Sequence, residues 1–124
     1  MRGFGRGAGA FGRRWLELYL LLLIAEKPSH GYELSARLKD FGVMIPGIGQ
    51  MGSLYRILST LEMGGLVATD WDMSEGGPAR KVYKITEEGF SFLEDAMESV
   101  YALKTNIENF IRRYEALKKE NKNN

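Results

Sequence analysis

The sequence contains no cysteine and one histidine, His30, among its 124 residues. The lack of cysteine excludes disulfides, thiol catalysis and the usual structural zinc clusters. A solitary histidine excludes most metal sites built on imidazole ligands, and a surface position at the start of a helix is the simpler interpretation of His30. We therefore expect neither a metal nor a cofactor.

Long hydrophobic runs are also missing. The most apolar stretch, Leu18–Ala25, is far shorter than the about 20 residues that a transmembrane helix needs. Arg13 and Arg14 precede it in the manner of a secretory signal, but no small-residue cleavage site follows. Together with the absence of cysteine, this pattern predicts a cytoplasmic protein without a membrane partner.

A large excess of one charge is absent too, because 17 Lys and Arg stand against 16 Asp and Glu, for a net charge of +1. This total argues against nucleic-acid binding, since domains that bind nucleic acid are often strongly basic. The distribution is uneven, however. Residues 1–59 carry eight basic and four acidic side chains, residues 60–103 three and nine, and residues 104–124 six and three. A nearly neutral chain can still present a basic face if its acids point elsewhere.

Glycine is concentrated at the amino terminus, where residues 1–12 hold five of the 15 glycines. Because glycine makes ordering costly, we expect this segment to be a flexible tail. Phe4 and Phe11, which stand near arginines, could stack on bases, but a solubilising tail is the simpler interpretation.

Two helices are expected next, over about 15–25 and 30–41. The first is apolar nearly all round, which indicates burial in the core or against a second subunit. The second has Ser29 as its expected N-cap and Gly42 as its expected carboxyl-terminal stop.

A third helix is expected over about 51–63, after a glycine-rich loop at 42–49. Its apolar residues form one stripe that should face the core. These residues are Leu54, Ile57, Leu58 and Leu61. The opposite face carries Tyr55, Arg56, Ser59 and Thr60, and Ser53 lies in the first turn.

After this helix the spacing of the apolar residues is no longer helical. Residues 66–72 and 80–85 are short runs with β-branched and aromatic residues, separated by a glycine-rich tip, which predicts a hairpin. Thr86 suits the N-cap of a last helix that continues to about Lys119. Such a helix would be about 50 Å long, too long for so small a core to cover. Its distal half therefore needs a partner, most simply a second copy of the chain.

Three helices followed by a hairpin is the order of a winged helix-turn-helix domain, in which the third helix enters the major groove of DNA. We predict a mainly α fold with a small β-hairpin. Its parts are a tail at 1–12, a winged helix-turn-helix domain at 13–86, a dimerisation helix at 87–119 and a frayed tail at 120–124.

The exposed face of the third helix has side chains that can bond to base edges or phosphates. The hairpin, or wing, carries basic residues after its flexible tip. The predicted DNA-binding residues are Ser53, Tyr55, Arg56, Ser59, Thr60, Arg80, Lys81, Tyr32 and His30. For Arg56 the sequence does not choose between a guanine edge and a phosphate, and a merely solvated helix face is the alternative interpretation.

Three motifs in this order resemble those of the PadR family of bacterial transcriptional regulators. They are SHGYEL at 29–34, GSLY at 52–55 with Leu58, Leu61-Glu62 and Gly65-Leu66-Val67 after it, and GGPARKVY at 76–83 followed by ITEEG at 85–89. The resemblance covers about residues 15–117. It implies a dimeric DNA-binding repressor whose carboxyl-terminal helices dimerise, and the single last helix resembles the smaller branch of the family. Gln50-Met51 departs from the Ser-Pro that the family often has there.

The resemblance also bears on ligands. In the smaller branch, flat aromatic molecules can enter a pore at the dimer interface between tryptophans of the last helix, but Val100 stands at the corresponding position here. Trp15, Tyr19 and Tyr101 are candidates for a ligand pocket, although packing is the simpler interpretation of such aromatics. The residues predicted for dimerisation are Trp15, Tyr19, Met97, Val100, Ile107, Phe110 and Tyr114.

These observations predict a sequence-specific DNA-binding regulator. We expect a homodimer that represses from an inverted-repeat operator in double-stranded DNA and is released by a hydrophobic or aromatic small molecule or another signal. The alternative is a winged-helix protein–protein interaction module without DNA. An enzyme is not expected, because the sequence has no nucleophile–base pair, phosphate loop or metal cluster. Asp70 and Asp72 alternate on a strand and more simply face solvent.

Overall fold

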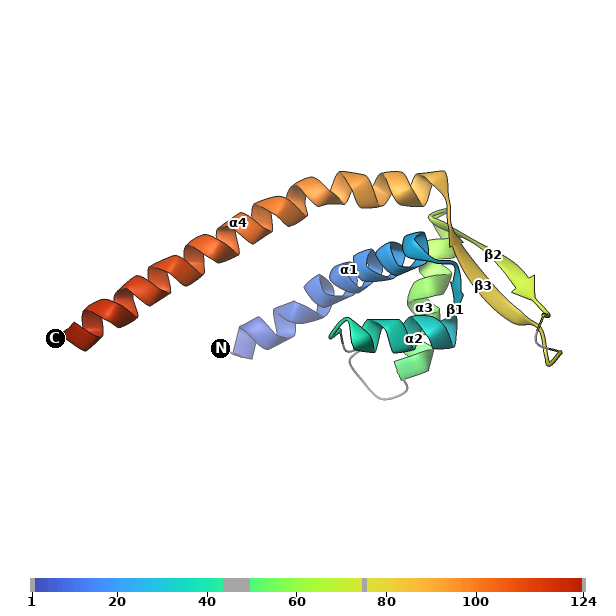
Figure 1. Ribbon diagram of the computed structural model, residues 1–124, viewed down its shortest axis with the longest axis horizontal. Helices are drawn as coiled ribbons and strands as arrows, with labels where there is room; N and C mark the ends of the chain where they lie inside the picture. The colour runs from blue at the N-terminus through green and yellow to red at the C-terminus, as the bar shows by residue number, and fades with distance from the viewer. Residues whose placement is uncertain (1, 44–49, 75, 124) are drawn as a thin grey trace. The chain divides into compact units, whose positions relative to one another are not determined.

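The computed structural model describes residues 2–43, 50–74 and 76–123. In chain order the elements are α1 (Arg2–Glu26), β1 (Ser29–His30), α2 (Gly31–Asp40), α3 (Gln50–Met63), β2 (Val67–Asp72), β3 (Arg80–Ile85) and α4 (Glu87–Asn123) (Figure 1). The chain forms two compact units, Met1–Leu93 and Glu94–Asn124. The predicted fold class, mainly α with a small antiparallel sheet, is confirmed.

Leucines on three helices form the core of the first unit. Side chains from α1, α2 and α3 are fully buried there, and Val67 and Tyr83 of the sheet join them. The fully buried residues of the three helices are Leu20, Leu21, Ile24, Leu34, Leu38, Leu54 and Leu58. Each such side chain contributes roughly 1.5–3 kcal/mol of transfer free energy. The predicted stripe of α3 is buried in full, which fixes the opposite face of that helix toward solvent.

Helix α1 is longer than the sequence predicted. It begins at Arg2, so residues 2–12, which we expected to form a flexible tail, continue the helix. Extending an existing helix fixes one residue for each new hydrogen bond, whereas starting a helix fixes several for the first bond. The apolar segment that follows can therefore propagate helix into the glycine-rich stretch.

The sheet has three antiparallel strands in the order β1-β3-β2. In the hairpin Val67 pairs with Ile85 and Trp71 with Lys81, close to the predicted strand boundaries. The two-residue strand β1, which the sequence did not predict, pairs Ser29 with Tyr83. This pairing ties the wing to the start of α2.

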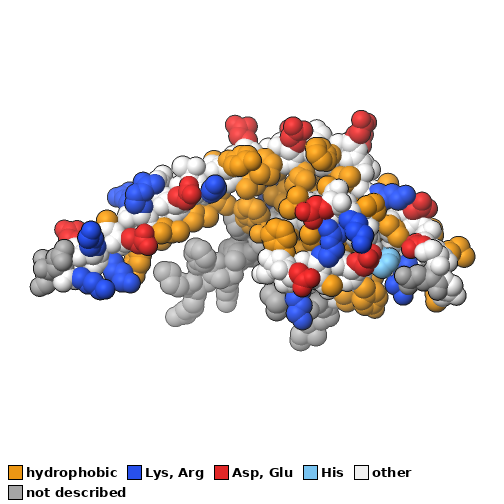
Figure 2. Space-filling view, viewed as in Figure 1, with side chains coloured by type: hydrophobic (Ala, Val, Ile, Leu, Met, Phe, Trp, Pro, Cys, Tyr) orange, Lys and Arg blue, Asp and Glu red, His pale blue; other side chains and the backbone are white. Residues whose placement is uncertain are grey.

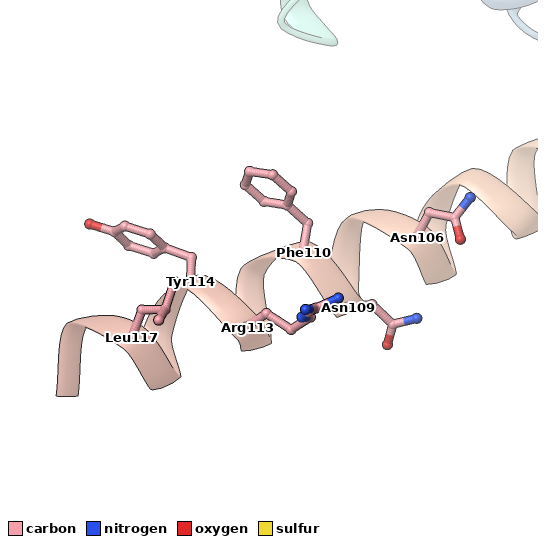
Figure 3. A pocket seen from close by; sticks show the side chains of 6 residues that line it. All are labelled: Asn106, Asn109, Phe110, Arg113, Tyr114 and Leu117. Atoms are coloured by element: carbon pink, nitrogen blue, oxygen red, sulfur yellow. The ribbon is translucent and has the colours of Figure 1, made fainter. Parts of the chain in front are cut away.

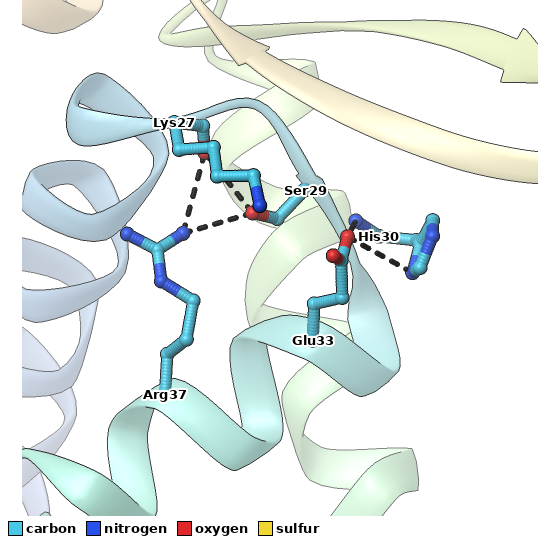
Figure 4. A network of polar contacts seen from close by, with 5 residues as sticks. All are labelled: Lys27, Ser29, His30, Glu33 and Arg37. Carbon is cyan, nitrogen blue, oxygen red and sulfur yellow. Dashed lines mark hydrogen bonds and ion pairs between the residues drawn. The ribbon is translucent and has the colours of Figure 1, made fainter.

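Ser29 does not cap α2, contrary to our expectation, because it is still extended in β1 (Figure 4). Its buried hydroxyl donates to the carbonyl oxygen of Lys27 at 3.0 Å and accepts from Arg37 Nη1 at 2.8 Å. His30 is the N-cap instead. Its backbone N–H donates to Glu33 Oε1 at 3.1 Å, which satisfies a backbone donor at the start of the helix.

The carboxyl-terminal ends of α2 and α3 lie close to the positions that the sequence predicted. Helix α2 stops at Asp40, before Gly42 as predicted, and residues 44–49 of the predicted loop lie outside the described residues. After α3, Gly65 adopts a φ of 76°, a left-handed conformation that costs glycine nothing. The N–H of Leu66 then donates to the carbonyl oxygen of Leu61 at 3.0 Å, which closes the helix.

Helix α4 begins at the predicted cap. The N–H of Gly89 donates to Thr86 Oγ1 at 2.9 Å, and the same hydroxyl lies 2.7 Å from the carbonyl oxygen of Gly65. The helix spans 37 residues, about 55 Å at 1.5 Å per residue. It runs to Asn123, so most of the tail that we expected to fray at 120–124 is helical.

Of the helices in the described ranges, none combines the length and the apolar character that crossing a membrane requires.

Candidate nucleic-acid interface

The exposed face of α3 carries the side chains that the sequence assigned to it. Tyr55, Arg56, Ser59 and Thr60 are exposed, and Ser53 is half-buried. Within the described part of the chain Arg56 makes no ion pair, so its guanidinium is available to a ligand. The hydroxyl of Thr60 donates to the carbonyl oxygen of Arg56 at 3.0 Å, which leaves its oxygen lone pairs on the exposed surface.

Tyr55 packs against the first residue of α2. A Cβ on Gly31 would lie 2.5 Å from the Tyr55 hydroxyl oxygen and 2.6 Å from two ring carbons, so only glycine fits there without a shift. The ring therefore joins α3 to α2, while 39% of the residue stays exposed. Sequence reasoning assigned Tyr55 to DNA and did not detect this packing; the glycine in the first turn of α2 was the available signal.

The start of α2 presents one of its two predicted contact residues more openly than the other. Tyr32 is 70% exposed. The His30 side chain is only 17% exposed, and its Nδ1 lies 3.1 Å from Glu33 Oε1. Of the two, Tyr32 is the side chain with room for a ligand.

The two basic residues of the wing have different surroundings. Arg80 is exposed at the start of β3, opposite Asp72. Lys81 instead donates to Glu62 Oε1 at 3.0 Å, and Glu62 also accepts a hydrogen bond from Thr69 at 2.9 Å. The hydrogen bond from Lys81 lowers the pKa of Glu62, and the same bond raises the pKa of Lys81. Sequence reasoning assigned Lys81 to DNA and missed its partner on α3.

The aspartates of β2 differ in exposure, because Asp70 is exposed as expected whereas Asp72 is half-buried. Asp70 is exposed and lies 3.4 Å from Lys84 Nζ, whereas Asp72 accepts the N–H of Ser74 at 2.9 Å. The backbone N–H of Trp71 is the largest cause that lowers the pKa of Asp70. Each of the two carboxylates thus has a hydrogen-bond partner within the wing.

Aromatic rings of α1 gather with one that lies directly after α2, in the first unit. The centroids of Trp15 and Tyr19 are 6.1 Å apart, and Tyr19 meets Phe41 edge to face at 4.9 Å. Tyr101, the third candidate for a ligand pocket, belongs to the second unit and is 63% exposed.

The second unit exposes an apolar face along α4. Figure 2 shows hydrophobic side chains in a line along the distal half of this helix, with charged side chains beside them. Around Phe110 and Tyr114 they border a shallow hollow of about 460 Å³ (Figure 3). Met97 and Val100 are half-buried. The exposed apolar residues are Ile107, Phe110, Ile111, Tyr114 and Leu117.

Among the residues that the structure describes, no three His, Asp or Glu side chains are grouped so that they could hold a metal ion.

Comparison with known proteins identifies the family of the chain. Residues 20–95 match the family model described as "Transcriptional regulator PadR-like family". The chain belongs to this family. The matched range includes α2, α3, the wing and the start of α4, so the recognition from the three sequence motifs is confirmed. No curated protein matches this PadR-like chain.

Solved structures agree with the family. A conserved protein of unknown function, described as a potential transcriptional factor, is 47% identical, with a TM-score of 0.71 over 83% of this chain and 90% of that one. A PadR-like transcription factor from Bacteroides fragilis is 27% identical, with a TM-score of 0.69 over 85% and 98%. A PadR-like regulator from Bacillus cereus is 31% identical, with a TM-score of 0.68 over 77% and 90%. The family and the last two of these neighbours are described as transcriptional regulators rather than enzymes.

Proposed function

We propose that this PadR-like protein is a sequence-specific DNA-binding regulator that acts as a dimeric repressor in the cytoplasm. One observation carries the proposal. Helix α3 buries its entire apolar stripe, and its opposite face presents Tyr55, Arg56 and Ser59 to solvent. Arg56 would contact a guanine edge or a phosphate in the major groove, and Arg80 a phosphate beside it.

The near-neutral charge of the chain fits a particular mode of binding. With a net charge of +1, attraction to phosphates alone would be weak at physiological salt. Useful affinity would come from base contacts and from two recognition helices that bind together. Two of the nine acids of residues 60–103 are paired with lysines, Glu62 with Lys81 and Asp70 with Lys84, which reduces their repulsion of phosphates.

Dimerisation through α4 supplies the second recognition helix. The exposed apolar face at Ile107, Phe110 and Tyr114 suits a second copy of the same helix, because a two-fold axis pairs one patch with itself. Met97, Val100, Trp15 and Tyr19 are the further residues we assign to the interface. Two heads would read half-sites whose centres are about 34 Å apart, as in an inverted repeat.

Release by an effector would act through the arrangement of the two protomers. A hydrophobic or aromatic small molecule that binds one arrangement of the dimer better than another would shift the spacing of the heads. Trp15, Tyr19 and Tyr101 offer aromatic surface for such a molecule. An interaction module without DNA is less well supported, because the exposed face of α3 has no carboxylate except the paired Glu62.

Selection from a random library of duplexes, followed by fluorescence anisotropy, tests DNA binding directly. Arg56→Ala is expected to weaken binding to the selected duplex by about 1–3 kcal/mol, and Arg56→Lys to restore only the share due to charge. Arg112→Ala, the same substitution on α4, is the control. If Arg56→Ala and the control bind equally well, α3 is not the reading element.

A further inference from the structure

A single carboxylate ties α3 to both strands of the wing. Glu62 lies in the last turn of α3 and accepts from Thr69 Oγ1 on β2 at 2.9 Å and from Lys81 Nζ on β3 at 3.0 Å. Thr69 and Lys81 lie on the same face of the hairpin, because they stand opposite Tyr83 and Trp71 respectively. One oxygen of the carboxylate serves each strand.

The tie lies beyond the short turn that joins α3 to β2. Gly64, Gly65 and Leu66 form this turn, and their N–H groups donate back to carbonyl oxygens of α3, which fixes the base of the hairpin. Tyr83 is buried opposite Thr69, and the two strands continue past this pair to Asp72 and Arg80. In Figure 1 the hairpin formed by β2 and β3 extends away from the helices. The side chain of Glu62 therefore provides polar contacts between this outer part of the hairpin and α3.

The two ion pairs of β3 differ in their exposure and in the element to which they join the strand. Lys81 and Glu62 are 37% and 33% exposed and join the wing to α3, whereas Lys84 and Asp70 are 51% and 68% exposed and join β3 only to β2. Residues 81 and 84 lie on opposite faces of the strand because their separation is odd. The Lys84–Asp70 pair is thus a built-in control for loss of one carboxylate beside a lysine.

We propose that Glu62 is a positioning residue for DNA recognition. Through Thr69 and Lys81 it holds the wing at the angle at which Arg80 and the exposed face of α3 contact one duplex together. Lys81 acts through this tie and not as a phosphate contact. The inference rests on the proposed DNA binding and adds to it how the two contact elements keep their relative geometry.

The direction in which one substitution changes DNA affinity shows whether Lys81 acts through the tie or as a phosphate contact. Glu62→Ala in the full-length protein is expected to weaken binding to the duplex selected by the wild-type protein about fivefold or more, because the wing loses its tie. If Lys81 is instead a phosphate contact restrained by Glu62, the same substitution frees it. Affinity then rises, and the dependence of log K on log salt steepens by about 0.9. Asp70→Ala, which removes the same charge, should change binding less than twofold.

Two further measurements test whether Glu62 and Lys81 act together and whether the wing moves without their contact. Lys81→Met should weaken binding as Glu62→Ala does, the double variant should be no worse than either single variant, and Lys81→Arg should restore affinity. In a Trp15→Phe background, the fluorescence of Trp71, opposite Lys81, should shift in Glu62→Ala without DNA. If the wild-type protein selects no duplex, the proposed function fails. If it does, and Glu62→Ala matches Asp70→Ala, only this inference is overturned.

Discussion

Replacement of Tyr114 by alanine should strongly weaken the proposed dimer. The residue is 57% exposed on the apolar face of α4. With roughly 200 Å² for a tyrosine side chain, about 110 Å² would be covered by a second copy, or about 3 kcal/mol per protomer at 25 cal/mol per Å². The alanine methyl and the polar hydroxyl reduce this to about 1.5 kcal/mol. Two protomers lose about 3 kcal/mol, which is more than a hundredfold in dissociation constant.

Sedimentation equilibrium over a range of concentrations measures this change. Tyr101→Ala is the matched control, because Tyr101 is 63% exposed on the same helix but lies off the apolar face. We expect its dissociation constant to stay within a few-fold of the wild-type value. Equal effects of the two substitutions, or a stable dimer after truncation at Ser99, would refute the assignment of the interface to this face.

Two other predictions concern stability. Gly31→Ala should lower the free energy of unfolding, measured in urea, by about 1–3 kcal/mol, because its Cβ meets the Tyr55 ring. Gly52→Ala has open space at its Cβ and should raise this free energy by about 0.5–1 kcal/mol. Equal values for the two variants would contradict the packing of Tyr55 against Gly31. Because the pKa of Glu62 is lowered in the fold by Lys81, the unfolded chain binds its proton more readily. The stabilisation is present above the unfolded pKa and is lost as pH falls through the folded one, so Glu62→Gln should lose less stability than the wild-type protein between pH 7 and pH 3.

The sequence predicted best what depends on local periodicity. The leucines of α3 recur at helical spacing, so burial of Leu54, Leu58 and Leu61 and exposure of the opposite face followed from the pattern. The cap at Thr86 was equally local, because a hydroxyl and the helix that it starts are neighbours in the chain.

Contacts between distant residues were beyond such reasoning. Ser29 looked like a cap, but its pairing with Tyr83, 54 positions later, keeps it extended. Likewise the sequence shows Lys81 only as a basic residue of the wing, because the hydrogen bond from Lys81 to Glu62 forms only when the hairpin folds against α3. Helix propensity was also overridden in residues 2–12, where the helix that follows extends into glycine-rich sequence.

The contact of the Thr86 hydroxyl with the carbonyl oxygen of Gly65 fixes where α4 starts relative to the end of α3. Beyond this start each residue turns α4 by 100°, so Ile107, Phe110 and Tyr114 share one side of the helix because they are three and four residues apart. Inserting one residue between Ile107 and Phe110 would turn Phe110 and Tyr114 by about 100° relative to Ile107, whereas inserting seven would return them to within about 20°. The length of α4 can therefore change in steps of about two turns while its apolar residues stay on one side of the helix.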